Sequence, residues 1–174
     1  MAWQVDKAHT QVSFSIRHLG VSFIKGTMSV ADAELTLDEA NPANSSLKGR
    51  MDMSTFTTHD PNRDGHLKSA DFFDVENNPY IEFATKKVAD KGNGKFDVTG
   101  DLTIKGNTGE VSLEGEYAGP VLDPVSGKRK VGFTMRGEID KTAFGVTWNV
   151  PMEGGKFMLA DKVTLDINAQ AIEA

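Results

Sequence analysis

One stretch of the chain crowds titratable side chains together. Residues 59–74, HDPNRDGHLKSADFFD, contain four aspartates, two histidines and two basic residues. Carboxylate and imidazole groups serve as metal ligands and as general acids or bases, so His66 with Asp64 or Asp71 would suit acid–base chemistry on a bound substrate. The separation of His59 from His66 matches no common zinc pattern, however. The aspartates can equally cap turns, so the stretch is either a reactive site or a polar loop around something else.

The remaining sequence offers little catalytic chemistry. It contains no G-x-S-x-G, no H-E-x-x-H and no glycine loop of the phosphate-binding type. It also contains no cysteine, which excludes a thiolate zinc site, a cysteine nucleophile and a disulfide. We therefore expect no catalytic residue, no resident metal and no cofactor. His9 and His18, at the two ends of one predicted strand, are expected to bond to local backbone rather than to act as ligands.

The length and composition favour one globular domain over residues 1–174. Hydrophobic residues make up 39% and charged residues 25%, which is ordinary for a soluble protein. The net charge of −6 disfavours nucleic acid as a partner, and no apolar run approaches the ~18 residues of a membrane-spanning helix. The opening MAWQVDK lacks the apolar segment of a signal peptide. We expect the chain as given to be cytoplasmic, and periplasmic if it is the processed form of a longer precursor.

Apolar and polar residues alternate along eight segments, which is typical of strands with one buried face. The segments are 11–18, 33–37, 46–53, 80–88, 95–106, 110–117, 130–140 and 162–171. Turn signals such as DKGNGK and KGNTGE separate several of them. The pattern predicts an all-β fold, an antiparallel sandwich or barrel. Only the polar loop at 37–46, which has room for a helical turn, and the stretch at 59–74 do not fit the strand pattern.

The elements that position the stretch at 59–74 are short. Asp60 precedes Pro61, which places a capping acceptor before a residue suited to the first turn of a helix. Leu67, Ala70 and Phe73 then recur every three residues. We predict one or two short helical turns whose apolar side packs over a barrel end or lines its entrance. The predicted lid or entrance residues are Arg63, His66, Leu67, Phe72 and Phe73.

Glycines occupy inward positions of several predicted strands. They are Gly49, Gly100, Gly115 and Gly137. Glycine weakens a strand interior because it packs nothing and costs chain entropy. Either these glycines let the sheet bend and close into a barrel, or the missing side chains leave internal volume for a ligand. The two interpretations are compatible.

The inward faces of the predicted strands are apolar and aromatic. The predicted interior, ligand-binding residues are Phe14, Ile16, Phe83, Phe96, Val98, Leu102, Leu113, Phe133, Met135, Phe144 and Leu165. None of them is charged, so a cavity lined in this way would take an apolar, flexible molecule with few polar demands. The alternative is that these side chains simply fill the core, and that the barrel is an interaction module without a lipid ligand.

Five segments in order carry a family resemblance: WQVDKAHTQVSFSIRHLGVSFIKG, NRDGHLKSADFFD, NNPYIEF, VTGDLTIKGNTGEVSL and AFGV. Together they span nearly the whole chain, and it resembles the YceI-like family of lipid- and polyisoprenoid-binding proteins. The sequence departs from the family pattern at three places. Asn78 stands where an aromatic residue is usual, Met28 where Phe is common, and Lys141 where Arg is frequent.

The resemblance implies a lipocalin-like, extended antiparallel β-barrel of about eight strands with one or two short helical segments. It also implies a long isoprenoid chain, often that of a quinone, held inside the barrel, and a homodimer. We therefore expect a non-enzymatic carrier or store of an isoprenoid lipid that binds no nucleic acid and does not span the membrane. The alternative from another class is an enzyme that acts on a bound lipid or quinone through His66, Asp64 and Asp71.

Overall fold

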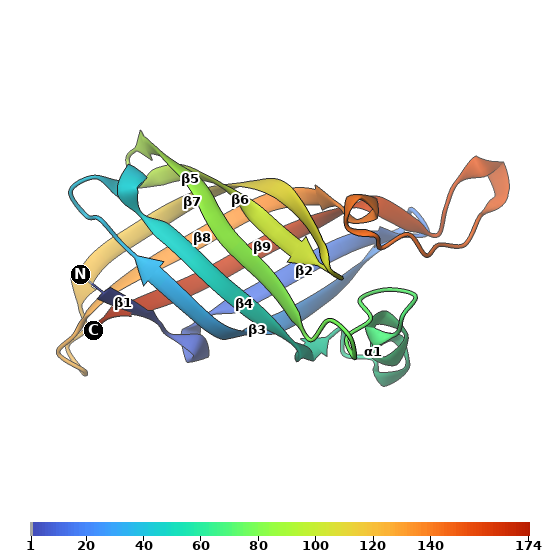
Figure 1. The fold of residues 1–174 in the computed structure, drawn as a ribbon, viewed down its shortest axis with the longest axis horizontal. Helices are drawn as coiled ribbons and strands as arrows, with labels where there is room; N and C mark the ends of the chain where they lie inside the picture. The colour runs from blue at the N-terminus through green and yellow to red at the C-terminus, as the bar shows by residue number, and fades with distance from the viewer. Residues whose placement is uncertain (1) are drawn as a thin grey trace.

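A computed structural model describes residues 2–174, and nine antiparallel strands form one sheet that curls into an elongated barrel (Figure 1). The strands are β1 (Ala2–Val5), β2 (Gln11–His18), β3 (Ser22–Thr36), β4 (Ser46–Thr57), β5 (Tyr80–Gly92), β6 (Lys95–Ile104), β7 (Asn107–Leu122), β8 (Arg129–Asp140) and β9 (Leu159–Glu173). The helical elements are α1 (Pro61–Lys68) and the 3₁₀ turns η1 (Lys7–His9), η2 (Pro42–Asn44), η3 (Lys141–Phe144) and η4 (Glu153–Gly155).

The barrel wall has eight strand positions. From β2 to β9, each strand pairs with the next one along the chain, and β9 pairs with β2, which closes the sheet. The short β1 pairs with β3 and β9, the same two neighbours that flank β2. Strands β1 and β2 therefore share one wall position, interrupted by η1. This arrangement confirms the predicted antiparallel barrel of about eight strands.

The predicted segments each overlap a strand, but β3 is far longer than predicted. It runs over 15 residues, of which only the last few were expected. The reason lies at Gly26, an inward position opposite Phe14 in the ladder. Because Gly26 has no side chain, the alternation that marks a strand is hidden there.

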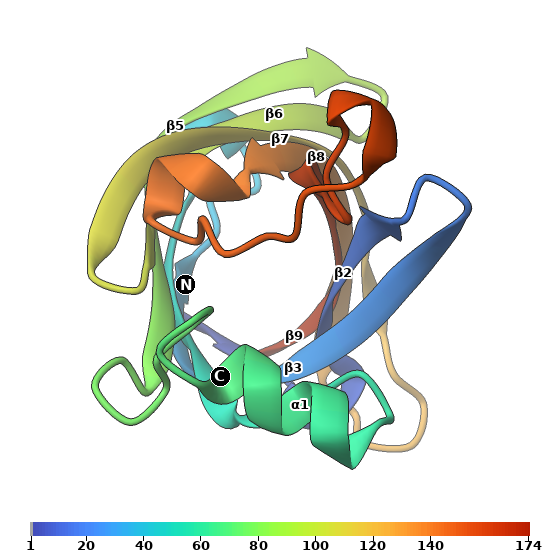
Figure 2. The same ribbon diagram turned by 90° about the vertical axis from the view of Figure 1, so that its right-hand side faces the viewer.

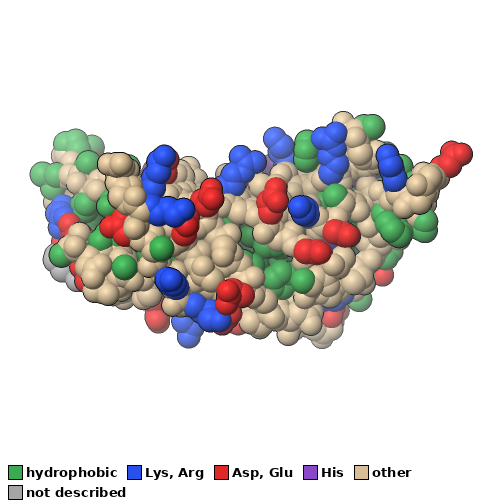
Figure 3. Space-filling model, turned by 90° about the horizontal axis from the view of Figure 1, so that it is seen from above, with side chains coloured by type: hydrophobic (Ala, Val, Ile, Leu, Met, Phe, Trp, Pro, Cys, Tyr) green, Lys and Arg blue, Asp and Glu red, His purple; other side chains and the backbone are tan. Residues whose placement is uncertain are grey.

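On the outer surface, acidic and basic side chains are interspersed, as Figure 3 shows for one face.

The inward glycines are covered by neighbouring side chains. A Cβ atom placed on Gly100 would lie 2.5 Å from Cζ of Phe83, and one placed on Gly115 would collide with the ring of Phe96. On Gly137, it would lie 2.5 Å from Cδ2 of Leu113. For Gly100, Gly115 and Gly137, the interpretation that the glycines hold open space for a ligand was therefore wrong. The rings of Phe83 and Phe96 and the side chain of Leu113 fill the space beside them, and aromatic rings are known to cover glycines in curved sheets in this way.

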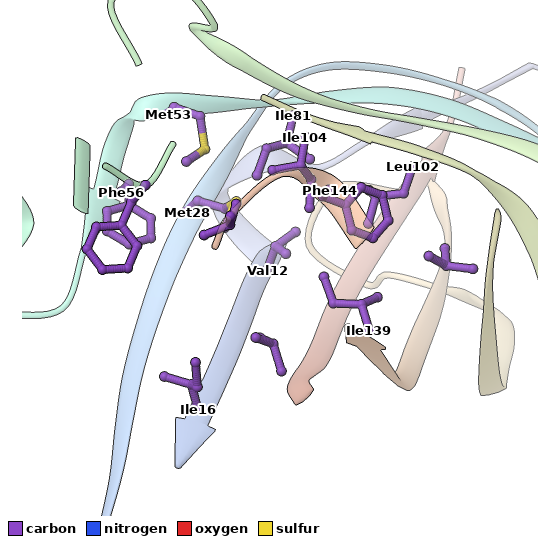
Figure 4. Packing of buried hydrophobic residues seen from close by; sticks show 14 of the residues in the cluster. Val12, Ile16, Met28, Met53, Phe56, Ile81, Leu102, Ile104, Ile139 and Phe144 are labelled. Atoms are coloured by element: carbon purple, nitrogen blue, oxygen red, sulfur yellow. The ribbon is translucent and has the colours of Figure 1, made fainter. Parts of the chain in front are cut away.

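The largest buried cluster gathers side chains from β2, β3, β4, β5, β6 and β8 with Phe144 of η3 (Figure 4). Met53 and Phe56 on β4 are its most buried members, each 1% exposed. The ring of Phe56 stacks on Phe14 of β2 with centroids 5.4 Å apart, and it meets Phe73 at 5.3 Å. Since Phe73 follows α1 in the chain, this cluster attaches the segment after α1 to the barrel.

Both segments that did not fit the strand pattern form short helical elements, as predicted. Asp60 caps α1: its carboxylate accepts hydrogen bonds from the backbone N–H groups of Asn62 and Arg63, and Pro61 occupies the first turn. The loop at 37–46 contains η2. Within residues 2–174, no helix is both long enough and apolar enough to cross a bilayer.

Candidate functional site

The barrel encloses two adjoining chambers. The first has a volume of about 360 Å³ and extends toward η2 and the chain termini, whereas the second, of about 190 Å³, lies toward α1 and η3. The two share four lining residues, Met28, Ile81, Ile104 and Leu165, so they meet at the middle of the barrel. The larger volume falls in the range of small-molecule binding sites.

The first chamber is lined by apolar side chains along most of its length. The predicted interior residues on its wall are Phe83, Phe96, Val98, Leu102, Leu113, Phe133 and Met135. The charged residues that line it are Asp38, Glu39 and Arg50, and Arg50 is held by an ion pair with Asp32. The loop that precedes η2 thus gives this end of the barrel an acidic border.

The second chamber gathers the remaining predicted residues. Phe14, Ile16 and Phe144 line it, Leu165 lines both chambers, and all five predicted lid residues, Arg63, His66, Leu67, Phe72 and Phe73, also border it. Figure 2 shows α1 across one side of the barrel end, beside this chamber. The structure therefore brings every predicted interior and lid residue to a chamber wall. That these residues bind a ligand stays a prediction.

Asp64 and Arg63 anchor α1 to the end of β4. The Asp64 carboxylate accepts hydrogen bonds from the Thr58 N–H at 2.8 Å and from the Thr57 hydroxyl at 3.1 Å. Burial alone would raise the pKa of Asp64, but the hydrogen bonds from Thr58 and Thr57 outweigh it, so the pKa lies below its ordinary value. Arg63 donates from Nε and Nη2 to the Thr58 hydroxyl and carbonyl oxygens, at 2.8 and 2.7 Å.

His66 forms the other polar contact of this segment. Its Nε2 lies 2.9 Å from a carboxylate oxygen of Asp71, and both side chains are about half exposed. Asp64 is engaged with Thr57 and Thr58 instead, so the structure assembles only part of the His66–Asp64–Asp71 group. In the part of the chain that the structure describes, no three His, Asp or Glu side chains converge in a way that could hold a metal ion.

Among the residues of the second chamber that the sequence did not reveal are Trp148, Lys141 and His18. The Trp148 ring packs edge-on against His66, with centroids 4.6 Å apart, and contacts Phe72 at 5.1 Å. It lies in the irregular segment after η3, where no periodicity could have assigned it a face. The expectation for His9 was wrong: its Nδ1 contacts the Asp6 carboxylate at 2.8 Å rather than local backbone.

Lys141 is the only lysine among the buried residues described. Its side chain is 6% exposed, and its ammonium lies 3.5 Å from an oxygen of Asp161, whose own side chain is 64% exposed. Lysine is rarely buried, and the sequence pattern assigned Lys141 no position in the fold. The sole hint was that Arg is frequent at this place in the resembled family.

Comparisons with known proteins agree with this architecture. A YceI-like domain model matches residues 3–171. A UPF0312 protein of Staphylococcus epidermidis is 33% identical over 165 residues, which cover 95% of this chain and 94% of the relative. A UPF0312 protein of Vibrio parahaemolyticus is 37% identical over 139 residues, 80% of this chain and 73% of that protein.

Solved structures show the same barrel. The Campylobacter jejuni YceI protein superposes with a TM-score of 0.75 at 29% identity, covering 91% of this chain and 90% of that one. Burkholderia cenocepacia BcnA gives 0.79 at 24% identity, covering 96% and 99%. A polyisoprenoid binding domain from Saccharophagus degradans gives 0.68 at 11% identity, covering 100% and 99%. With the family model and relatives spanning nearly all of it, the chain belongs to the YceI-like family.

Proposed function

We propose that this protein binds a long-chain isoprenoid lipid inside the barrel and carries or stores it. The observation that supports this proposal best is the pair of adjoining chambers, which are lined mainly by apolar side chains and share the wall residues Met28, Ile81, Ile104 and Leu165. An extended, branched hydrocarbon chain matches such an interior, because it needs apolar contact and few hydrogen bonds. An isoprenoid quinone is one lipid of this kind.

Burial of the chain supplies the affinity in this proposal. Each five-carbon isoprene unit transferred from water contributes roughly 4 kcal/mol, at about 0.8 kcal/mol per carbon group. Binding costs several kcal/mol in lost translational and rotational freedom. Two or three buried units therefore exceed that cost, and a longer chain binds tightly. The Saccharophagus degradans domain shares only the fold at 11% identity, so its description supports no more than the suitability of such a barrel.

The direct test is to extract the protein as it is purified. Detergent-free protein is shaken with organic solvent, and the extract is compared by mass spectrometry with that of an unrelated barrel purified in the same way. The proposal expects an isoprenoid lipid in the extract and a higher melting temperature on adding one. An extract without lipid above background, together with an unchanged melting temperature, would contradict it.

A chamber-filling variant gives a sharper test. Ala169 on β9 lines the first chamber, and its neighbour Asn168 is exposed. Ala169→Phe is expected to displace lipid from the chamber, whereas Asn168→Phe adds the same ring to the outer surface and is expected to leave binding unchanged. Equal binding by both variants would show that the lipid is held elsewhere.

An enzyme acting on the bound lipid is a second candidate, which the His66–Asp71 contact at the second chamber favours. A His66→Ala variant that keeps lipid but loses a turnover would support it.

The homodimer and the cellular compartment stay predictions. Light scattering of the purified protein and cell fractionation, respectively, test them.

A further inference from the structure

We infer that the second chamber receives an acidic head group of the lipid, a phosphate ester or a carboxylate, which binds the ammonium of Lys141. This inference rests on the proposed lipid binding and adds to it a chemical class for the head and a direction for the chain. The head lies at the α1 end of the barrel, and the tail extends into the first chamber.

The hydrogen bonding of Lys141 is incomplete. An ammonium group has three donors, and among residues 2–174 the single hydrogen bond of the Lys141 ammonium is the 3.5 Å contact to Asp161. That distance is at the limit for such a bond, and the carboxylate it reaches is 64% exposed to water. A buried charge is stable only when it is paired and hydrogen-bonded. Lys141 therefore has donors to spare at a chamber wall.

The backbone around Lys141 holds it in place. Asp140 caps η3 by accepting a hydrogen bond from the Thr142 N–H at 2.9 Å. At the other end, the Val146 N–H donates to the Lys141 carbonyl at 3.1 Å, and Gly145 ends the turn in the left-handed conformation with φ of 77°. Both ends of η3 are thus anchored, so a ligand would meet a group that is already positioned.

The charged side chains that line the two chambers differ. Arg63 and Lys141 line the second chamber together with His18 and His66, and no Asp or Glu among the described residues lines it. The first chamber has Asp38, Glu39 and Arg50 on its wall, where Glu39 pairs with Arg129 and Arg50 pairs with Asp32. In Figure 2, η3 and α1 lie on opposite sides of the same barrel end. An acidic head is therefore favoured at the end of the barrel where Arg63 and Lys141 lie.

Lys141 is the residue best suited to contact the head directly. Arg63 already donates to Thr58 through Nε and Nη2, and His66 is engaged by Asp71. The Arg63 guanidinium contributes positive field, whereas Lys141 contributes unused donors. A neutral head, such as an alcohol, would accept a hydrogen bond from Lys141 but would leave its charge uncompensated.

The test compares two ligands that share one tail: geranylgeranyl phosphate and geranylgeraniol. Titrations are done with the native protein, Lys141→Met, Lys141→Arg and Lys162→Met. Lys162 is an exposed lysine on the neighbouring strand β9, opposite Asp140, and serves as the matched control. Palmitate, added as a third ligand, shows whether a carboxylate is accepted as well as a phosphate.

The native protein is expected to bind the phosphate about 10–100-fold more tightly than the alcohol, as for a charge-assisted hydrogen bond. Lys141→Met should abolish this preference and leave the affinity for geranylgeraniol unchanged. Lys141→Arg and Lys162→Met should keep the preference. Without ligand, Lys141→Met should melt at or above the native temperature, because it removes a poorly paired buried charge.

Three results would overturn the inference: equal affinity of the native protein for phosphate and alcohol, a preference that survives Lys141→Met, or an equal loss for both ligands in that variant. In each of these cases, the proposed lipid binding would still be supported if geranylgeraniol binds to the protein. If neither prenyl ligand binds, the proposed function fails together with the inference. Binding of palmitate that depends on Lys141 would extend the site to fatty acids, and its absence would restrict the head to phosphate.

Discussion

The imidazole of His66 and the indole of Trp148 meet edge-on, with ring centroids 4.6 Å apart and planes at 85°. His66 belongs to α1, whereas Trp148 follows η3, so this contact joins two segments that the chain separates by the four strands β5 to β8. Phe72 completes the cluster from the loop after α1, 5.0 Å from His66 and 5.1 Å from Trp148. The three rings together form one wall of the second chamber.

Trp148→Ala is expected to release bound lipid faster than the native protein, because it removes the ring that joins α1 to the segment after η3. Each lost aromatic contact is worth about 0.5–1.5 kcal/mol, so an increase in the dissociation rate of roughly threefold to tenfold is expected. Displacement of a fluorescent prenyl lipid measures this rate. Trp148→Phe keeps an aromatic contact and should release lipid at nearly the native rate; equal rates for all three proteins would contradict the lid role.

Gly115→Ala is expected to weaken both folding and lipid binding. The added Cβ would collide with the ring of Phe96, which must then turn toward the first chamber, since Phe96 lines it. Overpacking of this kind costs about 1–3 kcal/mol in the free energy of unfolding, measured by urea denaturation. The control is Gly132→Ala on β8, where the nearest atom to a new Cβ is 3.9 Å away. If Gly115→Ala unfolded with the same free energy as the native protein, the predicted cost of the collision with Phe96 would be contradicted.

Asp64→Asn is expected to destabilise the protein near neutral pH but not in acid. The hydrogen bonds from Thr58 and Thr57 lower the folded-state pKa of Asp64. Their stabilisation is therefore present above the pKa of about 3.9 of the unfolded chain, and it is lost as the pH falls through the folded-state value.

The expected difference in unfolding free energy between native protein and Asp64→Asn is roughly 1–2 kcal/mol at pH 7, and it should shrink as the pH falls below about 4. Urea denaturation at a series of pH values measures it. Glu76→Gln, an exposed acid in the same loop region, should show a small difference at every pH. If the difference in unfolding free energy between the native protein and Asp64→Asn stayed the same at every pH, ionisation of Asp64 would not be its cause.

Phe56→Ala is expected to cost about 3–5 kcal/mol in the free energy of unfolding, the usual range for removal of a buried aromatic ring. Phe56 is 1% exposed and supports both Phe14 and Phe73. Thermal and urea unfolding measure the loss. Phe23→Ala removes an exposed ring and should cost far less. An equal loss of unfolding free energy in the two variants would contradict the central packing role of Phe56.

Much of the barrel wall could be predicted from the sequence. Val12, Phe14 and Ile16 alternate with polar residues, and the period of two is imposed by strand geometry itself. The start of α1 was equally local, because Asp60 and Pro61 satisfy the first backbone groups of a helix whatever lies around them. The predicted interior residues line the chambers for the same reason: once strands close into a barrel, one of their two faces must point inward.

The tertiary structure alone decided the features that depend on distant neighbours. Gly115 is filled by the ring of Phe96, a contact set by the register between two strands. The burial of Lys141 and its long contact with Asp161 follow from how η3 folds back against β9. Trp148 meets His66 only because closure of the barrel brings α1 and the segment after η3 to the same end of it. Periodicity and capping act over a few residues, whereas the polarity and shape of the chambers arise from closure of the whole sheet.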